Sequence, residues 1–249
     1  TGGAGYIGSE LTGALLRAGY NVTVIDNLMY DATSLLRYTT DERFKFIRGD
    51  VRDINLLTRQ LAVADIIIPL AALVGFPLCD RDPRGAEDIN HQHVATLARL
   101  KTRQQKIIYP CTNSGYGSSE DICTEESPLN PVSLYGRTKV AAEDAVKAVE
   151  NHVTFRLATV FGPSSRMRSD LLVNNFVLRA LREKVLVLYE CEFMRNYVHI
   201  HDVCGAFLFV LKNWQYCKNE TYNMGNDSLN MNKLELARKI SEHIPLEII

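Results

Sequence analysis

The sequence carries no large excess of charge of either sign. Its 249 residues include 28 Lys and Arg against 29 Asp and Glu, which gives a formal net charge of −1. The basic residues are scattered, apart from a local cluster that includes Arg166 and Arg168. A surface that binds nucleic acid or an anionic membrane needs clustered positive charge. The sequence therefore predicts neither nucleic acid nor a membrane as a partner.

Long apolar runs and paired cysteines are also missing. No apolar run reaches the roughly 18 residues that a membrane-spanning helix needs. The six cysteines show none of the short paired spacings that are typical of zinc sites or disulfide frameworks. We therefore expect no metal ion, reduced thiols and a cytoplasmic protein.

The first motif of the chain predicts a cofactor site. In the opening segment, Thr1-Gly-Gly-Ala-Gly-Tyr-Ile-Gly8, the glycines Gly2, Gly5 and Gly8 follow the spacing Gly-x-x-Gly-x-x-Gly. A helical pattern follows, and then a short apolar run that ends in Asp26. Glycines in such a turn let the backbone approach a pyrophosphate at the helix N-terminus, and an acidic residue about 20 positions later accepts hydrogen bonds from the adenosine ribose. A bare tight turn, the alternative, would not require Asp26.

A buried strand normally leads into a dinucleotide-binding turn, but nothing precedes Thr1 in this sequence. At the other end, the chain stops at Ile249 without a closing element. We therefore expect the sequence to lack the first strand and a C-terminal segment of a longer protein.

Short apolar strands alternate with helical patterns along the chain. The expected strands are 22–26, 44–48, 66–69, 107–109 and 153–157, and the expected helices are 9–18, 54–61, 86–101, 135–150, 171–183, 202–213 and 233–243. Uniformly apolar strands suit a parallel sheet that is buried on both faces, so the alternation predicts an α/β fold with a doubly wound parallel sheet of the Rossmann type. We assign residues 1–161 to a dinucleotide-binding domain. Residues 162–249 are mainly a smaller C-terminal substrate-binding region, interleaved with the last Rossmann elements.

The pattern Tyr135-Gly-Arg-Thr-Lys139 lies on one of the expected helices. Residues four apart share a helix face, so Tyr135 and Lys139 should point into the same site. A phenol is a poor base at pH 7 because its pKa is about 10, but a fixed ammonium group nearby favours the phenolate. The pair is a candidate general base with its activator. A surface Tyr–Lys pair is the alternative, and the dinucleotide motif upstream favours the catalytic interpretation.

Thr112 follows an apolar strand, where catalytic side chains gather in open parallel sheets. Its hydroxyl is placed to hydrogen-bond a substrate oxygen, although a Ser/Thr-rich turn is an alternative. Cys111 has no His at a recognisable partner spacing, so we expect it to be a packing residue. His199 and His201 alternate on an expected strand, but no third metal ligand can be assigned to them.

These motifs, in order along nearly the whole chain, resemble the extended short-chain dehydrogenases/reductases, a group of NAD-dependent sugar-nucleotide epimerases, dehydratases and 4-dehydrogenases. The resemblance implies NAD as cofactor, a nucleotide sugar as substrate, and at least a homodimer formed through helices 86–101 and 135–150. It implies Thr112, Tyr135 and Lys139 as the catalytic residues. The cofactor-binding residues that it implies are Gly2, Gly5, Tyr6, Ile7, Gly8, Asp26, Asn27, Asp50, Val51, Leu70, Ala71, Ala72, Tyr135 and Lys139.

The resemblance also implies a set of substrate-binding residues, namely Asn113, Ser114, Thr159, Arg166, Arg168, Asn174 and Arg195. Two positions depart from the family pattern: Pro69 replaces the His that usually precedes Leu-Ala-Ala, and Thr159 replaces an Asn, which weakens one substrate contact. The amino-acid sequences of segments 68–75, 113–117 and 166–174 are most similar to those of bacterial GDP-heptose 4-dehydrogenases.

The implied reaction is oxidation at C4 of the sugar, with Tyr135 taking the proton of the 4-hydroxyl group. The keto product either leaves, as in a 4-dehydrogenase, or is reduced from its other face, as in a 4-epimerase. A non-catalytic dinucleotide-sensing protein is an alternative of another class, but such a protein would be expected to lose Tyr135 or Lys139.

Loss of water from the sugar is not expected. The 4,6-dehydratases of this family place an Asp-Glu pair directly after the catalytic Thr, whereas this chain has Asn113 and Ser114, which do not titrate near pH 7. Glu120 and Asp121 follow Gly117 and are expected to lie outside the reach of the substrate.

Overall fold

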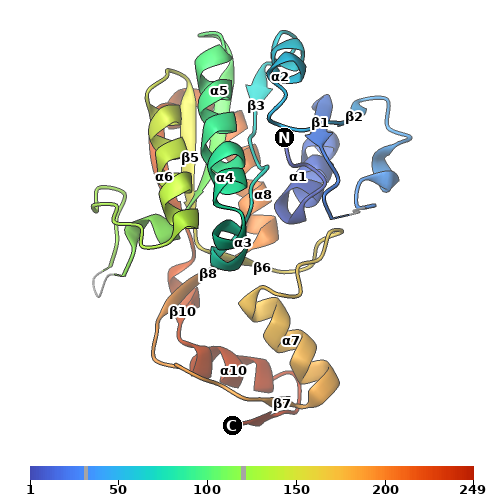
Figure 1. The fold of residues 1–249 in the computed structure, drawn as a ribbon. Coiled ribbons are helices and arrows are strands. Elements are labelled where there is room, and N and C mark those ends of the chain that lie inside the picture. Colours follow the sequence, from blue (N-terminus) through green and yellow to red (C-terminus); the bar gives the residue numbers. More distant parts are fainter. Residues whose placement is uncertain (31–32, 119–121) are drawn as a thin grey trace.

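The computed structural model describes residues 1–30, 33–118 and 122–249. Two unequal parts are visible, a larger one in which helices flank a set of strands and a smaller one that carries the C-terminal end (Figure 1). Glu120 and Asp121, which the sequence analysis expects to lie outside the reach of the substrate, are not among the described residues. None of the described helices is both long and apolar enough to cross a membrane.

Parallel strands form the centre of the larger part. The strands β3 (Ile66–Ile67), β4 (Lys106–Thr112), β5 (His152–Leu157) and β9 (Glu220–Met224) are neighbours in that order, and β1 (Val22–Asp26) pairs with β2 (Phe44–Arg48). Residues 1 and 2 connect these two groups, because the Gly2 amide donates to the Ile25 carbonyl (2.8 Å) and the Leu70 amide donates to the Thr1 carbonyl (2.9 Å).

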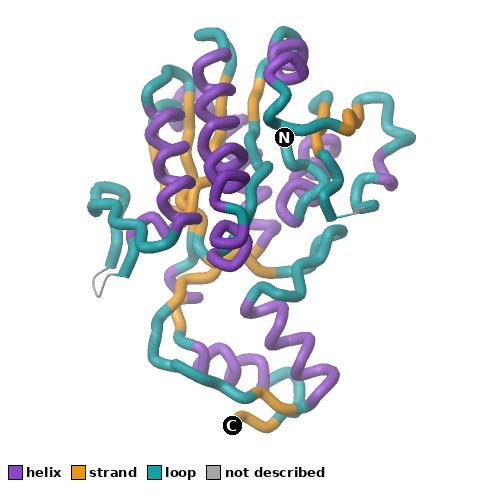
Figure 2. Tube along the Cα trace, viewed as in Figure 1, coloured by secondary structure: helices purple, strands orange, loops and turns teal. Residues whose placement is uncertain are grey.

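Helices cover both faces of this sheet. One face is covered by α2 (Ile54–Leu61), α5 (His93–Leu100) and α6 (Leu134–Lys147), and the other by α1 (Tyr6–Arg17) and α8 (Ile200–Lys212). Successive residues of β4 alternate between the two apolar cores: Ile107 packs with the α5 and α6 side, and Ile108 with the α1 and α8 side. The predicted doubly wound parallel fold is confirmed, and Figure 2 shows this succession of helices and strands.

Local sequence explains where several helices begin. Asp53 caps α2 by accepting a hydrogen bond from the Leu56 amide (3.0 Å), and Ser133 caps α6 in the same way through the Gly136 amide (3.0 Å). The helix α10 (Lys233–Ser241) starts with a capping box in which Asn232 and Glu235 each accept from the other's backbone amide.

The smaller part has its own apolar core. It is built from α7 (Leu172–Glu183), α10 and very short strands: β6 (Thr159–Phe161), β7 (Val185–Leu186), β8 (Arg195–His199), β10 (Asn230–Met231) and β11 (Glu247–Ile248). The order β10-β8-β6 makes one small sheet, and β11 pairs with β7. Between β8 and β10 the chain passes through the larger part as α8, α9 (Trp214–Cys217) and β9, and it ends in the smaller part.

Short helical segments complete the chain. These are η1 (Leu36–Tyr38), α3 (Phe76–Arg81), α4 (Pro83–Ala86), η2 (Glu87–Gln92), η3 (Asn113–Tyr116) and η4 (Asp227–Leu229). Several expected element ends differ from the structure, and two of the differences concern motifs of the sequence. Helix α1 begins at Tyr6 instead of residue 9, because the glycine turn leads directly into it. His201 lies in the first turn of α8, since β8 ends at His199, and the two imidazole centroids are 4.8 Å apart.

Candidate active site

A cavity of about 750 Å³ opens where the larger and smaller parts meet. This volume is within the range of about 300–1,000 Å³ that is typical of cofactor and small-molecule sites. The cavity is lined by residues of the glycine turn, the ends of β1 and β4, helix α6, and the segment that leads into α7. Every predicted site residue except Asn174 is part of this lining.

The glycine turn presents backbone, not side chains, to the cavity. Gly2 has a φ of 73°, and a Cβ atom there would lie 2.4 Å from the Ala71 amide nitrogen. A Cβ atom on Gly8 would lie 2.4 Å from the Gly2 carbonyl oxygen. No described side chain caps α1, so the first amides of this helix face the cavity without an intrahelical partner. An anionic pyrophosphate fits this position.

Asp26 ends β1 beside the turn. Its carboxylate oxygens accept hydrogen bonds from the amides of Ala4 (3.0 Å) and Leu28 (2.9 Å), which fix the orientation of the group. Each carboxylate oxygen can accept a second hydrogen bond, so the group remains able to bind ribose hydroxyls. The turn, the helix end and Asp26 together suit a dinucleotide.

Asp50 and Val51, two of the predicted cofactor-binding residues, also line the cavity. Asp50 also pairs with Arg52, whose Nη2 lies 2.6 Å from a carboxylate oxygen. The Arg52 guanidinium, which donates hydrogen bonds to this carboxylate, lowers the pKa of Asp50. The pairing keeps the Asp50 carboxylate ionised and oriented.

Asp26 leads to a prediction about cofactor choice. A carboxylate held at this position repels the 2′-phosphate of NADP, and residues 27–31 contain no Arg that would reverse the effect. We expect NAD to bind about tenfold or more tightly than NADP, and Asp26→Asn to reduce this preference. Calorimetric titration of both cofactors measures the ratio, with the surface change Asp144→Asn as control. Tighter binding of NADP to the unaltered protein would contradict the prediction.

Tyr135 and Lys139 lie on one face of α6, and both line the cavity. Burial raises the pKa of the Tyr135 phenol, and the Arg168 charge and a hydrogen bond with Thr112 oppose this rise. Burial lowers the pKa of Lys139 to about 8. The Lys139 ammonium nitrogen lies 4.2 Å from the ring centroid of Tyr109. The sequence did not indicate that Arg168 acts on the phenol.

Thr112 is the last residue of β4, and its hydroxyl oxygen accepts from the Ser114 amide (3.2 Å). The side chain is buried beside Tyr135, so two of the candidate catalytic hydroxyls meet in one place. The neighbouring Cys111 thiol donates to the Lys139 carbonyl (3.5 Å), and burial raises its pKa. A neutral, packed thiol is a poor nucleophile.

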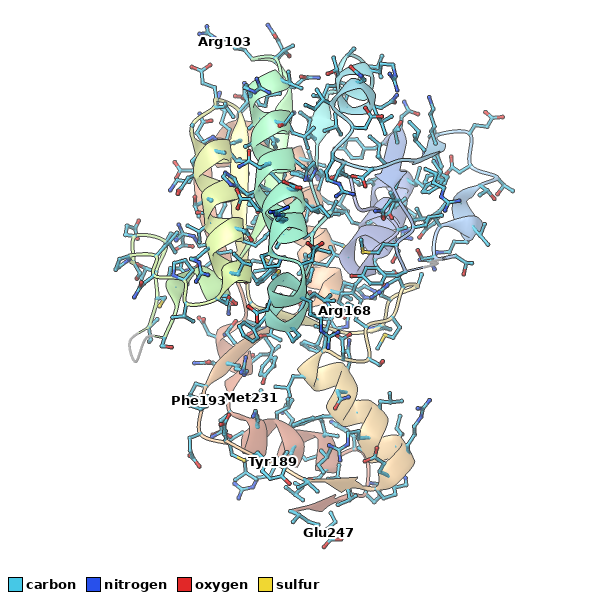
Figure 3. The ribbon with its side chains drawn as sticks, viewed as in Figure 1. Arg103, Arg168, Tyr189, Phe193, Met231 and Glu247 are labelled. Carbon is cyan, nitrogen blue, oxygen red and sulfur yellow. The ribbon has the colours of Figure 1, made fainter. Side chains whose placement is uncertain are left out.

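Three arginines face the cavity from the segment before α7 and from β8. Arg168 lies where the two parts meet and pairs with Asp170 (Figure 3). Arg166 places its guanidinium carbon 4.4 Å from the ring centroid of Tyr30. Arg195 is exposed at the start of β8. Guanidinium groups bind phosphate oxygens in a bidentate manner, so this edge suits a diphosphate.

The segment 162–165 is attached to α1. The Tyr6 hydroxyl donates to the Gly162 carbonyl (2.7 Å), and the Ser164 hydroxyl donates to the Tyr6 carbonyl (2.7 Å). The Ser165 amide and hydroxyl both donate to Glu10 (2.8 Å each). These bonds attach the segment that precedes the cavity residue Arg166 to the helix whose N-terminal residues also line the cavity.

Asn174 does not contact the cavity, which corrects the expectation from the sequence. Its amide oxygen accepts from the Gly162 amide (3.0 Å), and its amide nitrogen donates to the Tyr6 hydroxyl (3.2 Å) and the Arg168 carbonyl (3.0 Å). The residue is buried, and its hydrogen bonds restrain the segment 162–168 next to the cavity.

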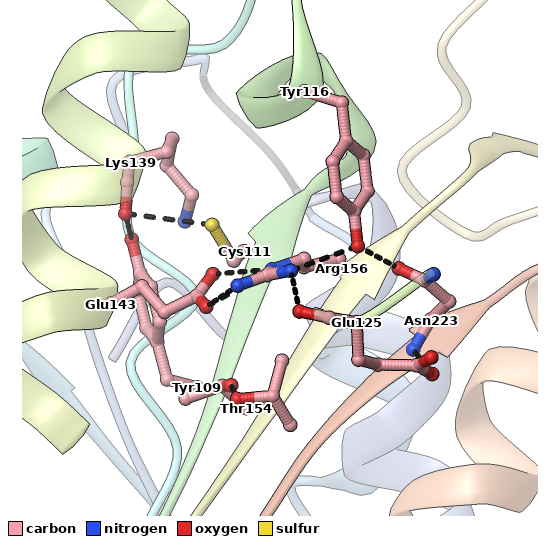
Figure 4. Close-up of polar contacts among 10 residues, drawn as sticks. Tyr109, Cys111, Tyr116, Glu125, Lys139, Glu143, Thr154, Arg156 and Asn223 are labelled. Atoms are coloured by element: carbon pink, nitrogen blue, oxygen red, sulfur yellow. Dashed lines mark hydrogen bonds and ion pairs between the residues drawn. The ribbon is translucent and has the colours of Figure 1, made fainter. Parts of the chain in front are cut away.

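The sequence did not indicate a buried polar network next to Lys139 (Figure 4). Arg156 donates to the Glu143 carboxylate through Nη2 (2.7 Å) and Nε (3.0 Å), and these side chains are 3% and 0% exposed. Arg156 Nη1 also donates to the Tyr116 hydroxyl (2.9 Å) and the Glu125 carbonyl (2.9 Å). In the sequence, Glu143 follows Lys139 by four residues, and this spacing indicates that the two side chains share a helix face.

Among the described residues, no group of three or more His, Cys, Asp or Glu side chains is placed to hold a metal ion. The residues that line the cavity are instead the glycine turn, Asp26 and the Thr–Tyr–Lys set.

Comparison with known families agrees with this geometry. The model of the NAD dependent epimerase/dehydratase family matches residues 1–225. The chain belongs to this family. It is accordingly an NAD-dependent enzyme, and the alternative of a non-catalytic sensing protein is not supported.

Named relatives span most of the chain. It is 31% identical over 259 residues to the low-salt glycan biosynthesis protein Agl12 of Haloferax volcanii, a match that covers 98% of this chain and 81% of the relative. It is 28% identical over 273 residues to a UDP-glucose 4-epimerase of Lacticaseibacillus casei, again covering 98% and 81%.

Solved structures of the family superpose closely. DesIV, a dTDP-glucose 4,6-dehydratase from Streptomyces venezuelae with NAD and TYD bound, gives a TM-score of 0.86 at 28% identity, covering 97% of this chain and 79% of that one. A UDP-glucuronic acid 4-epimerase from Bacillus cereus, in complex with UDP-glucuronic acid and NAD, gives 0.87 at 25% identity, covering 100% and 84%.

Proposed function

We propose that this enzyme oxidises C4 of a nucleotide-linked sugar. The observation that carries the proposal is that Thr112, Tyr135 and Lys139 line the same cavity as the dinucleotide turn. Bound NAD supplies the hydride acceptor. Relatives named as UDP-glucose 4-epimerase and dTDP-glucose 4,6-dehydratase support a nucleotide sugar as the substrate class.

Each candidate residue has one task in this proposal. Tyr135 takes the proton of the 4-hydroxyl group, and Thr112 hydrogen-bonds the same oxygen. Lys139 provides the fixed positive charge that favours the phenolate and holds the ribose next to it. The cavity arginines hold the diphosphate of the substrate.

The keto sugar then has two possible fates, release by a 4-dehydrogenase or reduction from the other face by a 4-epimerase. The named 4-epimerase relatives favour the second fate. Dehydration is not part of the proposal, because Asn113 and Ser114 line the cavity directly after Thr112. An amide and an unactivated hydroxyl do not titrate near pH 7, so they cannot act as the acid and base of an elimination.

Product mass tests this assignment. We expect the enzyme, incubated with NAD and a panel of UDP-, dTDP- and GDP-sugars, to yield a product of unchanged mass from a 4-epimerase reaction, or one lighter by two hydrogen atoms from a 4-dehydrogenase. Chromatography separates a 4-epimer from the unreacted sugar, mass spectrometry detects the loss of two hydrogen atoms or of water, and absorbance at the NADH band reports net oxidation. Heat-inactivated enzyme is the control. A product lighter by one water would contradict the proposal.

The finer assignments are also proposals. A GDP-linked heptose is a candidate substrate because residues from the three segments of similar wording, including Val74, Ser114 and Leu171, line the cavity. A cytoplasmic location is supported by the buried Cys79 and Cys204, which form no disulfide.

A homodimer is supported by α5 and α6, which lie side by side on one face (Figure 1). The outer side of α6 offers small residues, with Ala141 and Ala145 half-buried and Ala148 exposed. Light scattering at micromolar concentration measures the assembly directly.

A further inference from the structure

Glu143 is a fully buried carboxylate on the helix that carries the candidate base. Tyr135, Lys139 and Glu143 are spaced four apart on α6, so they follow one another along one face. Glu143 is 0% exposed and, unlike the other two, does not line the cavity. Burial of a carboxylate costs free energy unless the group is paired, so its place here requires an explanation.

Arg156 supplies the pairing and also connects other elements. Its guanidinium holds Glu143 on α6, the Tyr116 hydroxyl on η3 and the Glu125 carbonyl in the loop that follows. Tyr116 in turn donates to the Asn223 amide oxygen on β9 (2.6 Å). The segment η3 begins directly after Thr112. The Glu143–Arg156 ion pair therefore joins α6, the helix that carries Tyr135, to the turn that follows Thr112 (Figure 4).

The groups around Lys139 come from several elements. Strand β4 contributes the Tyr109 ring and the Cys111 thiol, α6 contributes the Tyr135 phenol, and the imidazole of His93 on α5 is within electrostatic range. At neutral pH these groups are uncharged, because burial raises the pKa of the phenols and the thiol and lowers that of His93 to about 4.

The Arg156 cation of β5 lies on the far side of the carboxylate, bound to it (Figure 4). Burial lowers the pKa of Lys139, and negative charge on Cys111 or on Glu143 opposes this effect. Because the Cys111 thiol is neutral near pH 7, the Glu143 carboxylate is the charge that raises the pKa of Lys139 there. Glu143 is thus the anion that acts on the ammonium group of Lys139, in addition to the Tyr109 ring 4.2 Å from it.

We propose that Glu143 is a positioning residue whose carboxylate, held by Arg156, keeps Lys139 charged and aligned with Tyr135. Arg156 restrains Glu143 in one orientation, so the carboxylate remains available to act on Lys139 without entering the cavity. The inference rests on the proposed role of Lys139 in the reaction, but its first measurement does not depend on any activity.

The first measurement is the titration of Lys139 in the cofactor-free protein. Trace acylation with acetic anhydride from pH 6 to 11, followed by peptide mass spectrometry, gives the pH at which Lys139 becomes reactive. We expect Glu143→Gln to lower this midpoint by about one pH unit or more, because loss of a nearby opposite charge favours the neutral amine. Asp144→Asn, an exposed change on the same helix, should not move it. An unchanged midpoint in Glu143→Gln would overturn the proposal.

A second variant covers the case in which Glu143→Gln does not fold. The double change Glu143→Gln with Arg156→Met removes both buried charges and leaves neither unpaired. We expect it to lower the Lys139 midpoint, by less than the single change does, because the anion Glu143 on the same face of α6 is removed together with the Arg156 cation that opposes it. A midpoint equal to that of the unaltered protein would again overturn the proposal.

The pH profile of turnover tests the consequence for the reaction. Loss of the Lys139 charge should move the alkaline limb of kcat to lower pH in Glu143→Gln. Val146→Ala, a destabilising change at a fully buried site on α6, should leave the limb in place. A uniform loss of kcat at every pH in Glu143→Gln would indicate a structural role only. If the acylation midpoint moves while Tyr135→Phe remains active, the proposed function fails and the effect of Glu143 on Lys139 stands.

Discussion

Replacement of Tyr135 by Phe should reduce turnover by about 10²–10⁴-fold, the usual contribution of a general acid–base group. Tyr135 lines the cavity beside Thr112, whose hydroxyl is hydrogen-bonded to the phenol, and the charge of Arg168 also acts on the phenol. The change removes one oxygen atom and keeps the ring, so the fold and the affinity for NAD should be nearly unchanged.

The measurement is kcat at saturating substrate, together with calorimetric titration of NAD. Tyr216→Phe is a matched control, since this tyrosine is 89% exposed on α9. Activity within a few-fold of the unaltered enzyme in Tyr135→Phe would show that another group removes the proton. A large loss of NAD affinity would show that the phenol mainly holds the cofactor.

Replacement of Arg156 by Met should be the most damaging single change to stability. It leaves the Glu143 carboxylate buried without a partner and removes the hydrogen bonds to Tyr116 and to the Glu125 carbonyl. Breaking a buried ion pair in this way costs about 3–5 kcal/mol of unfolding free energy. In a chain of this size that corresponds to a fall in melting temperature on the order of 10 °C.

Thermal and urea unfolding measure this loss, with Arg103→Met as a control at an exposed arginine at the far end of the molecule (Figure 3). The double change Glu143→Gln with Arg156→Met should recover much of the stability, because no charge is then left unpaired. A single variant as stable as the unaltered protein would show that Glu143 takes up a proton or water at little cost.

The sequence predicted those helices and strands whose apolar pattern and bounding turn residues lie within a short stretch of chain. The boundaries of β1, β2 and α2 agree with the sequence analysis, because each is an apolar or periodic run between turn residues. The spacing of Tyr135 and Lys139 predicted that they line a common cavity, since helix geometry alone places them on one face.

Contacts between distant segments could not be predicted in this way. Strand β9, Glu-Thr-Tyr-Asn-Met, has too few apolar residues to stand out, and its pairing with β5 is what identifies it. The partners of Arg156 come from α6, η3 and a loop, so no local spacing relates them. Asn174 likewise matched a motif, but its three bonds to Gly162, Tyr6 and Arg168 depend on the folded chain.

The attachment of segment 162–165 to α1 bears on how long a cofactor stays bound. Gly162, Ser164 and Ser165 are hydrogen-bonded to this helix, and Arg166, which lines the cavity, contacts the Tyr30 ring beyond the end of β1. We expect a dinucleotide bound between the glycine turn and Arg166 to leave more slowly than the sugar, because these hydrogen bonds restrain the chain next to it. Slow cofactor exchange beside faster sugar exchange would let the hydride return to the sugar before the cofactor departs. The time for which these hydrogen bonds stay closed would then determine whether the enzyme consumes NAD or recycles it.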